Sequence, residues 1–164
     1  MDALALLKSK RAHAARFANE GGATGERATV SSRDNWVSRP KGRAMKVLLE
    51  ALACAGTPIK ATSFDAIALP EGVEVDFFDI EQVEAALGDM VFIEIKSSNQ
   101  ERVQPDFTGF FFSLTEKEIE AADLLGNRHI VALYNRQTDA IRLTTVAEIF
   151  RRTKSTNWQV SVQL

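Results

Sequence analysis

The nine residues Met90-Val-Phe-Ile-Glu-Ile-Lys-Ser-Ser98 constrain the fold more than any other stretch of this chain. Apolar and polar side chains alternate along them with the period of two that is typical of a half-buried β-strand. Because Glu94 and Lys96 are two residues apart, a strand would point both side chains from the same face. The sequence therefore predicts a carboxylate and an ammonium side by side, serving either as a chemical site or as a solvated strand face.

The composition indicates one globular domain. A chain of 164 residues can bury a hydrophobic core, and its 45% hydrophobic and 26% charged residues are ordinary proportions for a soluble protein. No apolar run approaches the roughly 20 residues that cross a bilayer, and the N-terminus lacks the charged start of a signal peptide. The single cysteine, Cys54, cannot form an internal disulfide and is expected to be buried in a helix. We therefore expect a cytoplasmic protein without membrane contacts.

Charge is distributed unevenly along the chain. Residues 1–46 carry ten Lys or Arg and four Asp or Glu (net +6), whereas the remainder carries ten and eighteen (net −8). A basic segment of this kind either binds phosphate groups or pairs with the acidic body, and both interpretations stay open. We expect a basic N-terminal arm, a helix followed by irregular chain, over residues 1–41, and an α/β domain over residues 42–164. Trp36 would anchor this arm to the body or to a partner.

Hydrophobic periodicity and capping residues predict a mixed α/β fold. Asp79 is the expected N-cap of one helix, and Thr115 with Glu118 forms a capping box at the start of another. The expected helices are 2–19, 42–55, 79–87, 115–125 and 145–152. The expected strands are 63–69, 73–78, 90–98, 129–134, 140–143 and 158–164.

Most enzyme signatures are missing from the sequence. It has no G-x-S-x-G, no G-x-x-x-x-G-K-[ST] and no G-x-G-x-x-G, so it gives no sign of a small-molecule cofactor. One cysteine and two distant histidines, His13 and His129, do not make a zinc site, and we expect His129 to be structural. Carboxylates remain as the candidate chemical groups, and carboxylate oxygens are the ligands that Mg²⁺ prefers.

Glu94-Ile95-Lys96 on a strand resembles the PD-(D/E)XK nuclease superfamily when its neighbouring elements are included. In that family the core runs helix, three strands, helix, strand. The matching elements here are the helix at 42–55, strands from about 62 to 97, the helix at 115–125 and the strand at 129–134. The segment from Gly109 to Tyr134 is also similar to small restriction-endonuclease-like domains. The resemblance covers residues 42–144 and implies a restriction-endonuclease-like core, with a central mixed sheet flanked by helices.

The resemblance also implies a chemistry. Glu94, an upstream Asp and the Ile95 carbonyl would hold Mg²⁺ or Mn²⁺, which would polarise the scissile phosphate and acidify a water molecule. Lys96 would orient that water or stabilise charge on the phosphate. The expected reaction is hydrolysis of DNA phosphodiester bonds to a 5′-phosphate and a 3′-hydroxyl.

The upstream Asp is where this sequence departs from the family pattern, because no Pro-Asp pair precedes the Glu-Ile-Lys triplet. Asp65 is favoured narrowly, since antiparallel pairing of its strand would place it beside the triplet. Asp76, eighteen residues before Glu94, stays open as the alternative catalytic and metal-binding residue. Asp79 is set aside as an N-cap, and Glu50 is a weaker candidate for a supporting ligand.

Three functions are compatible with these patterns. The first is a metal-dependent DNA endonuclease, expected to be a homodimer because cutting both strands of a duplex with one site per chain needs two subunits. The second is a catalytically inactive nuclease fold that serves as a DNA-binding or assembly subunit. The third is an α/β interaction domain with no role in nucleic-acid chemistry.

Overall fold

The computed structural model describes residues 25–26, 29–30 and 33–154, so the helix expected at 2–19, the strand expected at 158–164 and His13 lie outside the described residues. The described residues form one five-stranded mixed sheet in the order β1-β2-β3-β4-β5. Its strands are β1 (Trp36–Ser38), β2 (Ala66–Ala68), β3 (Val91–Ser98), β4 (His129–Asn135) and β5 (Ala140–Thr144). Neighbouring strands are antiparallel except β3 and β4, which are parallel. No helix in this described part is long and apolar enough to span a membrane.

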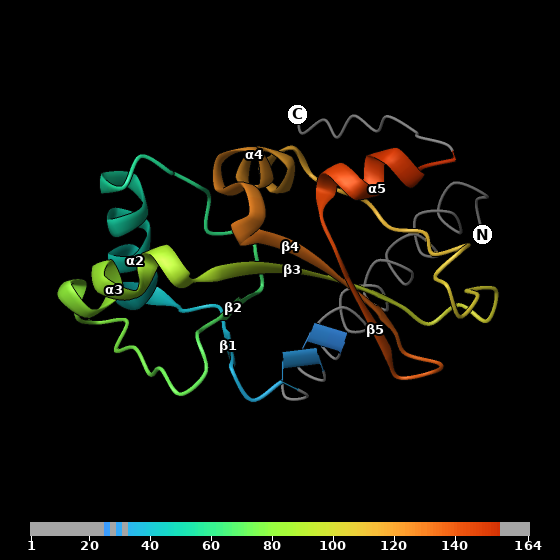
Figure 1. The fold of residues 1–164 in the computed structure, drawn as a ribbon, viewed down its shortest axis with the longest axis horizontal. Helices are drawn as coiled ribbons and strands as arrows, with labels where there is room; N and C mark the ends of the chain where they lie inside the picture. Colours follow the sequence, from blue (N-terminus) through green and yellow to red (C-terminus); the bar gives the residue numbers. More distant parts are fainter. Residues whose placement is uncertain (1–24, 27–28, 31–32, 155–164) are drawn as a thin grey trace, which may run out of the picture.

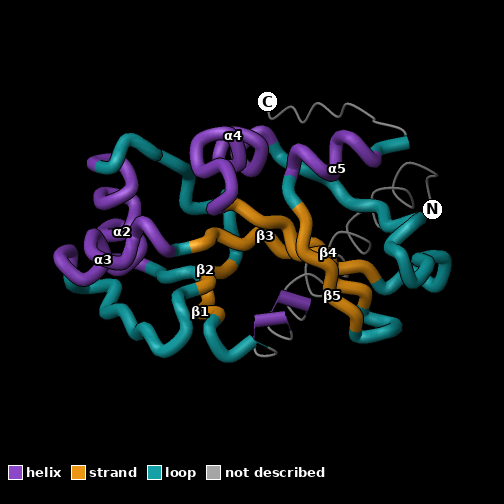
Figure 2. The backbone as a smooth tube through the Cα atoms, viewed as in Figure 1, coloured by secondary structure: helices purple, strands orange, loops and turns teal. Residues whose placement is uncertain are grey.

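The four longer helices of the described residues collect at one end and along one side of the sheet, apart from the short helical pieces at 25–26 and 29–30 (Figure 1). They are α2 (Gly42–Cys54), α3 (Ile80–Ala86), α4 (Glu116–Leu125) and α5 (Val146–Arg152), and short 3₁₀ turns follow α3 and α4. Figure 2 shows α2 and α3 together near the β1–β2 end, and α4 and α5 beside β3, β4 and β5. The α/β class predicted from periodicity is therefore confirmed for the described residues.

Capping residues define where two of these helices begin, as the sequence predicts. The Asp79 side chain accepts hydrogen bonds from the amides of Glu81 and Gln82 at the start of α3. Thr115 and Glu118 form the complete capping box of α4. Gly126 follows the last turn of α4 with a φ of 57°, a backbone conformation that favours glycine. A parallel strand pair needs a long crossover, and α4 provides it between β3 and β4.

The larger hydrophobic core lies between one face of the sheet and α2, α3 and α4. Phe64 and Phe92 meet edge to face at its centre, with ring centroids 5.1 Å apart and planes at 83°. On the same sheet face, Val131 and Leu133 of β4 continue this core as a second cluster with residues of α4 and α5. One face of the sheet is thus covered along its length by helices.

The other face of the sheet carries a further apolar cluster of Trp36, Ala66, Ile93, Ile95 and Ala132. Trp36 is buried there as the first residue of β1, so the predicted anchoring onto the body is confirmed. Because apolar residues cover β3 from both sides, the expectation of a half-buried strand with one solvated face is wrong. Its Glu–Lys pair is enclosed.

Three local predictions are wrong. Residues 73–78 form no strand, because the Asp76 carboxylate accepts a hydrogen bond from the Phe78 amide in a turn that leads into α3. The antiparallel strands of the sheet begin with β1, which lies before residue 42. The sheet therefore includes part of the segment 1–41 expected to be an arm. Cys54 is exposed, because the last residue of α2 lies off the helix face that buries Leu48 and Leu52.

Candidate active site

Glu94 and Lys96 lie on the helix-covered face of β3. Lys96 Nζ is 2.8 Å from Glu94 Oε1, and only 7% of the Glu94 side chain and 14% of the Lys96 side chain are exposed. Both side chains point from one strand face, as their i, i+2 spacing predicts. The pair is therefore a buried ion pair and not part of a solvated surface.

Asp65 reaches this pair from the residue before β2. Its backbone amide donates to the Ile93 carbonyl at 2.7 Å, which holds the residue against β3. Its carboxylate Oδ2 accepts a hydrogen bond from the Ile95 amide at 2.9 Å. Ile95 separates Glu94 from Lys96, so Asp65 lies beside the triplet, at the place that antiparallel pairing of β2 and β3 predicts.

The other predicted acidic candidates lie elsewhere. Asp76 is exposed in the turn before α3, where its backbone amide donates to Gln82 Oε1. It is not among the charged groups that shift the pKa of Glu94. Glu50 is exposed on α2. Of the acidic residues singled out upstream, Asp65 is the one that the fold brings to Glu94.

Glu118, at the N-terminal turn of α4, completes the surroundings of Lys96. Both of its carboxylate oxygens are 3.0 Å from Lys96 Nζ, and the side chain is buried. Sequence reasoning assigned Glu118 only to the capping box. The capping pattern indicates that the Glu118 side chain folds back over the start of α4. It does not indicate that this side chain contacts Lys96, which lies 22 residues earlier in the sequence.

Arg39, just after β1, holds the segment that presents Asp65. Its guanidinium Nη1 donates to the carbonyls of Ala61 and Phe64 at 3.1 and 2.9 Å and lies 3.9 Å from Asp65 Oδ1. Its backbone amide donates to the Asp65 carbonyl at 2.9 Å. The sequence placed this arginine among the basic residues of an arm, and no local pattern indicated its role here.

His129, the first residue of β4, contacts the same segment from the interior. Its Nε2 lies 3.1 Å from the Ser63 carbonyl, an acceptor, so Nε2 carries the proton. Nδ1 is buried with no hydrogen-bond partner among the described residues. Burial lowers the pKa of His129, which favours the neutral ring, and the Nε2 hydrogen bond joins β4 to the chain two residues before Asp65.

The site gathers three carboxyl groups, those of Asp65, Glu94 and Glu118, with two cationic side chains, Lys96 and Arg39. Burial raises the pKa of Glu94 to about 8, and the neighbouring Asp65 carboxylate adds to this rise. Burial also raises the pKa of Asp65, against the opposing effects of the Ile95 amide and Arg39. Burial alone would lower the pKa of Lys96, but Glu94 and Glu118 together outweigh it and raise that pKa, so Lys96 remains an ammonium. Enclosed, mutually repelling carboxylates favour binding of a cation.

The oxygen atoms beside Ile95, carboxylate and carbonyl, are of the kind that a hard divalent cation prefers. Among the described residues, no three or more His, Cys, Asp or Glu side chains gather closely enough to hold a metal. Mg²⁺ needs fewer, because it is commonly bound by one or two carboxylates together with waters and substrate phosphate. Asp65 and Glu94 offer two carboxylates. The Ile95 carbonyl points to the same strand edge as the Ile95 amide, toward Asp65 and beyond the end of β2.

In comparison with known proteins, no family model, no curated protein and no solved structure matches this chain.

Proposed function

We propose that this chain is a nuclease that uses Mg²⁺ or Mn²⁺ to hydrolyse DNA phosphodiester bonds. The observation that carries the proposal is the hydrogen bond from the Ile95 amide to Asp65 Oδ2. This bond brings a second carboxylate from another segment to the buried Glu94–Lys96 pair. Two carboxylates can hold a divalent cation that activates water, and a nearby ammonium can stabilise the charge that develops on the phosphate.

The arrangement of elements supports a restriction-endonuclease-like core. The strands β1, β2 and β3 are successively antiparallel, and α4 then carries the chain to the parallel strand β4. The family order is helix, three strands, helix, strand. This chain differs from it at one point, because β1 precedes α2 and only two of the three strands lie between α2 and α4.

In the proposed reaction, Asp65, Glu94 and the Ile95 carbonyl would hold the cation, which would polarise the phosphate and acidify a water molecule. Lys96 donates hydrogen bonds as an ammonium, either to the attacking water or to a non-bridging phosphate oxygen. The water oxygen bonds to phosphorus and releases one proton to solvent as the P–O3′ bond breaks. The electron pair of that bond stays on O3′, which takes up one proton from solvent, so the products are a 5′-phosphate and a 3′-hydroxyl.

We further propose that two chains act together on a duplex, since each chain offers one such site among its described residues and each strand needs one cut. Light scattering after size exclusion is expected to give twice the chain mass of 18.1 kDa. A mass of one chain, in a protein that still converts supercoiled plasmid directly to linear product, would contradict the dimer.

A second candidate is an inactive nuclease fold that binds DNA or assembles with other proteins. The observation favouring it is that Lys96 is already paired with two carboxylates, Glu94 and Glu118, in a closed ion-pair network. Buried ion pairs of this kind also occur where they only specify the fold.

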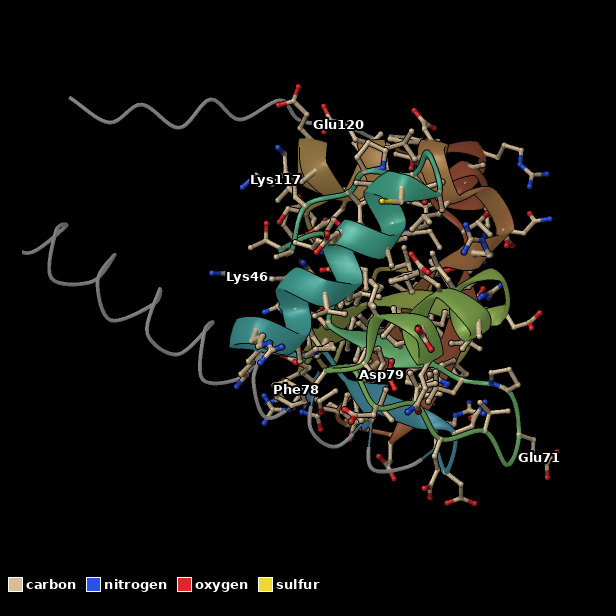
Figure 3. The ribbon with its side chains drawn as sticks, turned by 90° about the vertical axis from the view of Figure 1, so that its left-hand side faces the viewer. Lys46, Glu71, Phe78, Asp79, Lys117 and Glu120 are labelled. Atoms are coloured by element: carbon tan, nitrogen blue, oxygen red, sulfur yellow. The ribbon has the colours of Figure 1, made fainter. Side chains whose placement is uncertain are left out.

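One experiment separates the two candidates. Plasmid and single-stranded DNA are incubated with the protein in Mg²⁺, in Mn²⁺ and in EDTA, beside Lys96→Ala and Lys117→Ala. Lys117 is a matched control because it is an exposed lysine that points outward from α4 (Figure 3). We expect metal-dependent cutting by the wild type and Lys117→Ala, and a loss of roughly 100-fold or more in Lys96→Ala.

Circular dichroism must show that Lys96→Ala is folded, because the substitution leaves two buried carboxylates without their partner. Cutting that persists in a folded Lys96→Ala would refute the proposed site. Absence of cutting by the wild type, together with DNA binding that weakens steeply with salt, would favour the inactive module.

A further inference from the structure

We infer that Glu118 is a positioning residue that holds the Lys96 ammonium in the site independently of Glu94. The inference rests on the proposed function for the reaction that Lys96 serves, but the contact between the two side chains does not depend on it. Both Glu118 oxygens lie 3.0 Å from Lys96 Nζ, a two-oxygen contact that fixes the ammonium more closely than one oxygen would.

The Glu118 carboxylate has its own support. Its Oε2 accepts a hydrogen bond from the Thr115 amide at 2.9 Å, so the capping box orients the carboxylate without any contribution from Lys96. It lies in the first turn of α4, where the helix dipole favours a negative charge. Glu118 is therefore a prearranged anion on the helix side of Lys96, whereas Glu94 lies on the same strand as the lysine.

Lys96 needs such an anchor for a simple electrostatic reason. Its side chain is a flexible four-carbon chain with a point charge, and a divalent cation beside Glu94 would repel that charge. Glu94 would share its charge with the cation and would hold the ammonium less strongly. Among the described residues, Glu118 is the other carboxylate within ion-pair distance of Lys96 Nζ. It keeps the ammonium close while Glu94 serves the metal.

The first test is kinetic and uses Glu118→Gln beside Glu120→Gln. Glutamine retains the capping-box pattern, so α4 keeps its start while Lys96 loses the charge that holds it. Glu120 is a matched control, an exposed glutamate on the same helix that points outward (Figure 3). For Glu118→Gln we expect kcat to fall about 10- to 100-fold with KM for DNA changed less than about threefold. Equal kcat in the two variants would overturn the inference.

The second test is spectroscopic and needs neither metal nor DNA. A lysine ammonium held by buried carboxylates exchanges its protons slowly and gives a proton–nitrogen NMR signal, which Lys96→Met would assign. We expect this signal in the wild type and in Glu120→Gln, and its loss through exchange in Glu118→Gln. A signal that persists unchanged in Glu118→Gln would overturn the inference.

The two tests separate the inference from the proposed function. If the wild type does not cut DNA but the Lys96 signal depends on Glu118, the nuclease proposal fails and the positioning of Lys96 by Glu118 stands. If the wild type cuts DNA and neither kcat nor the signal responds to Glu118→Gln, the nuclease proposal stands and the role of Glu118 fails.

Discussion

Two carboxylates, those of Glu94 and Glu118, pair with the Lys96 ammonium in an enclosed part of the molecule, and the Asp65 carboxylate lies beside them on the Ile95 amide. Each desolvated charge costs free energy, and the Lys96 ammonium with the more distant Arg39 guanidinium does not fully compensate three carboxylates. The cost is greatest at Glu94, whose pKa rises to about 8 through burial and then through Asp65. A protein that keeps such a cluster loses stability at neutral and basic pH, and a bound cation would offset that loss.

This cost predicts a pH dependence of stability. The folded-state pKa of Glu94, about 8, is above its ordinary value of 4.5, so between these pH values the folded protein keeps a proton that the unfolded chain has released. The stabilisation that this proton provides is complete below pH 4.5 and is lost as pH rises through 8. Metal-free wild type should therefore lose on the order of 2 kcal/mol more unfolding free energy than Glu94→Gln between pH 5.5 and 9.

Urea unfolding in EDTA at several pH values measures this difference, with Glu84→Gln as the control because Glu84 is an exposed glutamate on α3. The variant keeps the Lys96–Glu118 contact, so it should remain folded. Parallel stability curves for wild type and Glu94→Gln would show that Glu94 has an ordinary pKa in the folded protein.

At the scale of the elements, helix starts were predictable and short strands were not. Asp79 and Thr115 identify the starts of α3 and α4 because a cap is a local hydrogen bond within three residues. Residues 73–78 alternate like a strand, yet Asp76 bonds to its own turn and no strand of the described sheet pairs with them. β1 has only three residues, and pairing with β2 forms it where local periodicity is absent.

The same distinction governs the site. Glu94 and Lys96 could be predicted together because two residues on a strand share a face by geometry alone. Asp65 could be predicted because the next antiparallel strand returns beside the first. Arg39 and Glu118 could not, because their positions depend on where a three-residue strand and a crossover helix pack. Strand geometry thus predicts the site residues at the β2–β3 pair, whereas the positions of Arg39 and Glu118 depend on tertiary packing.

At the scale of the whole molecule, a single sheet joins the hydrophobic clusters that lie on its two faces. β3 is central to this arrangement, because it pairs with β2 on one side and β4 on the other and is buried on both faces. The clusters under α2 and under α4 and α5 lie along one face of that sheet. Opening either cluster would expose β3 or β4, so we expect residues 33–154 to unfold cooperatively.

Two matched substitutions test this cooperativity. Leu52→Ala removes a buried leucine from the cluster under α2, and Leu133→Ala removes one from the cluster under α4 and α5. Each should lower the free energy of unfolding by about 2–5 kcal/mol, whereas Leu143→Ala, at a position 46% exposed, should cost much less. In urea, each variant should lower the midpoint and leave the slope m unchanged, with fluorescence and circular dichroism giving one transition. Two separate transitions in either core variant would mean that the clusters unfold independently, and the site between α4 and β2 would then join two units of different stability.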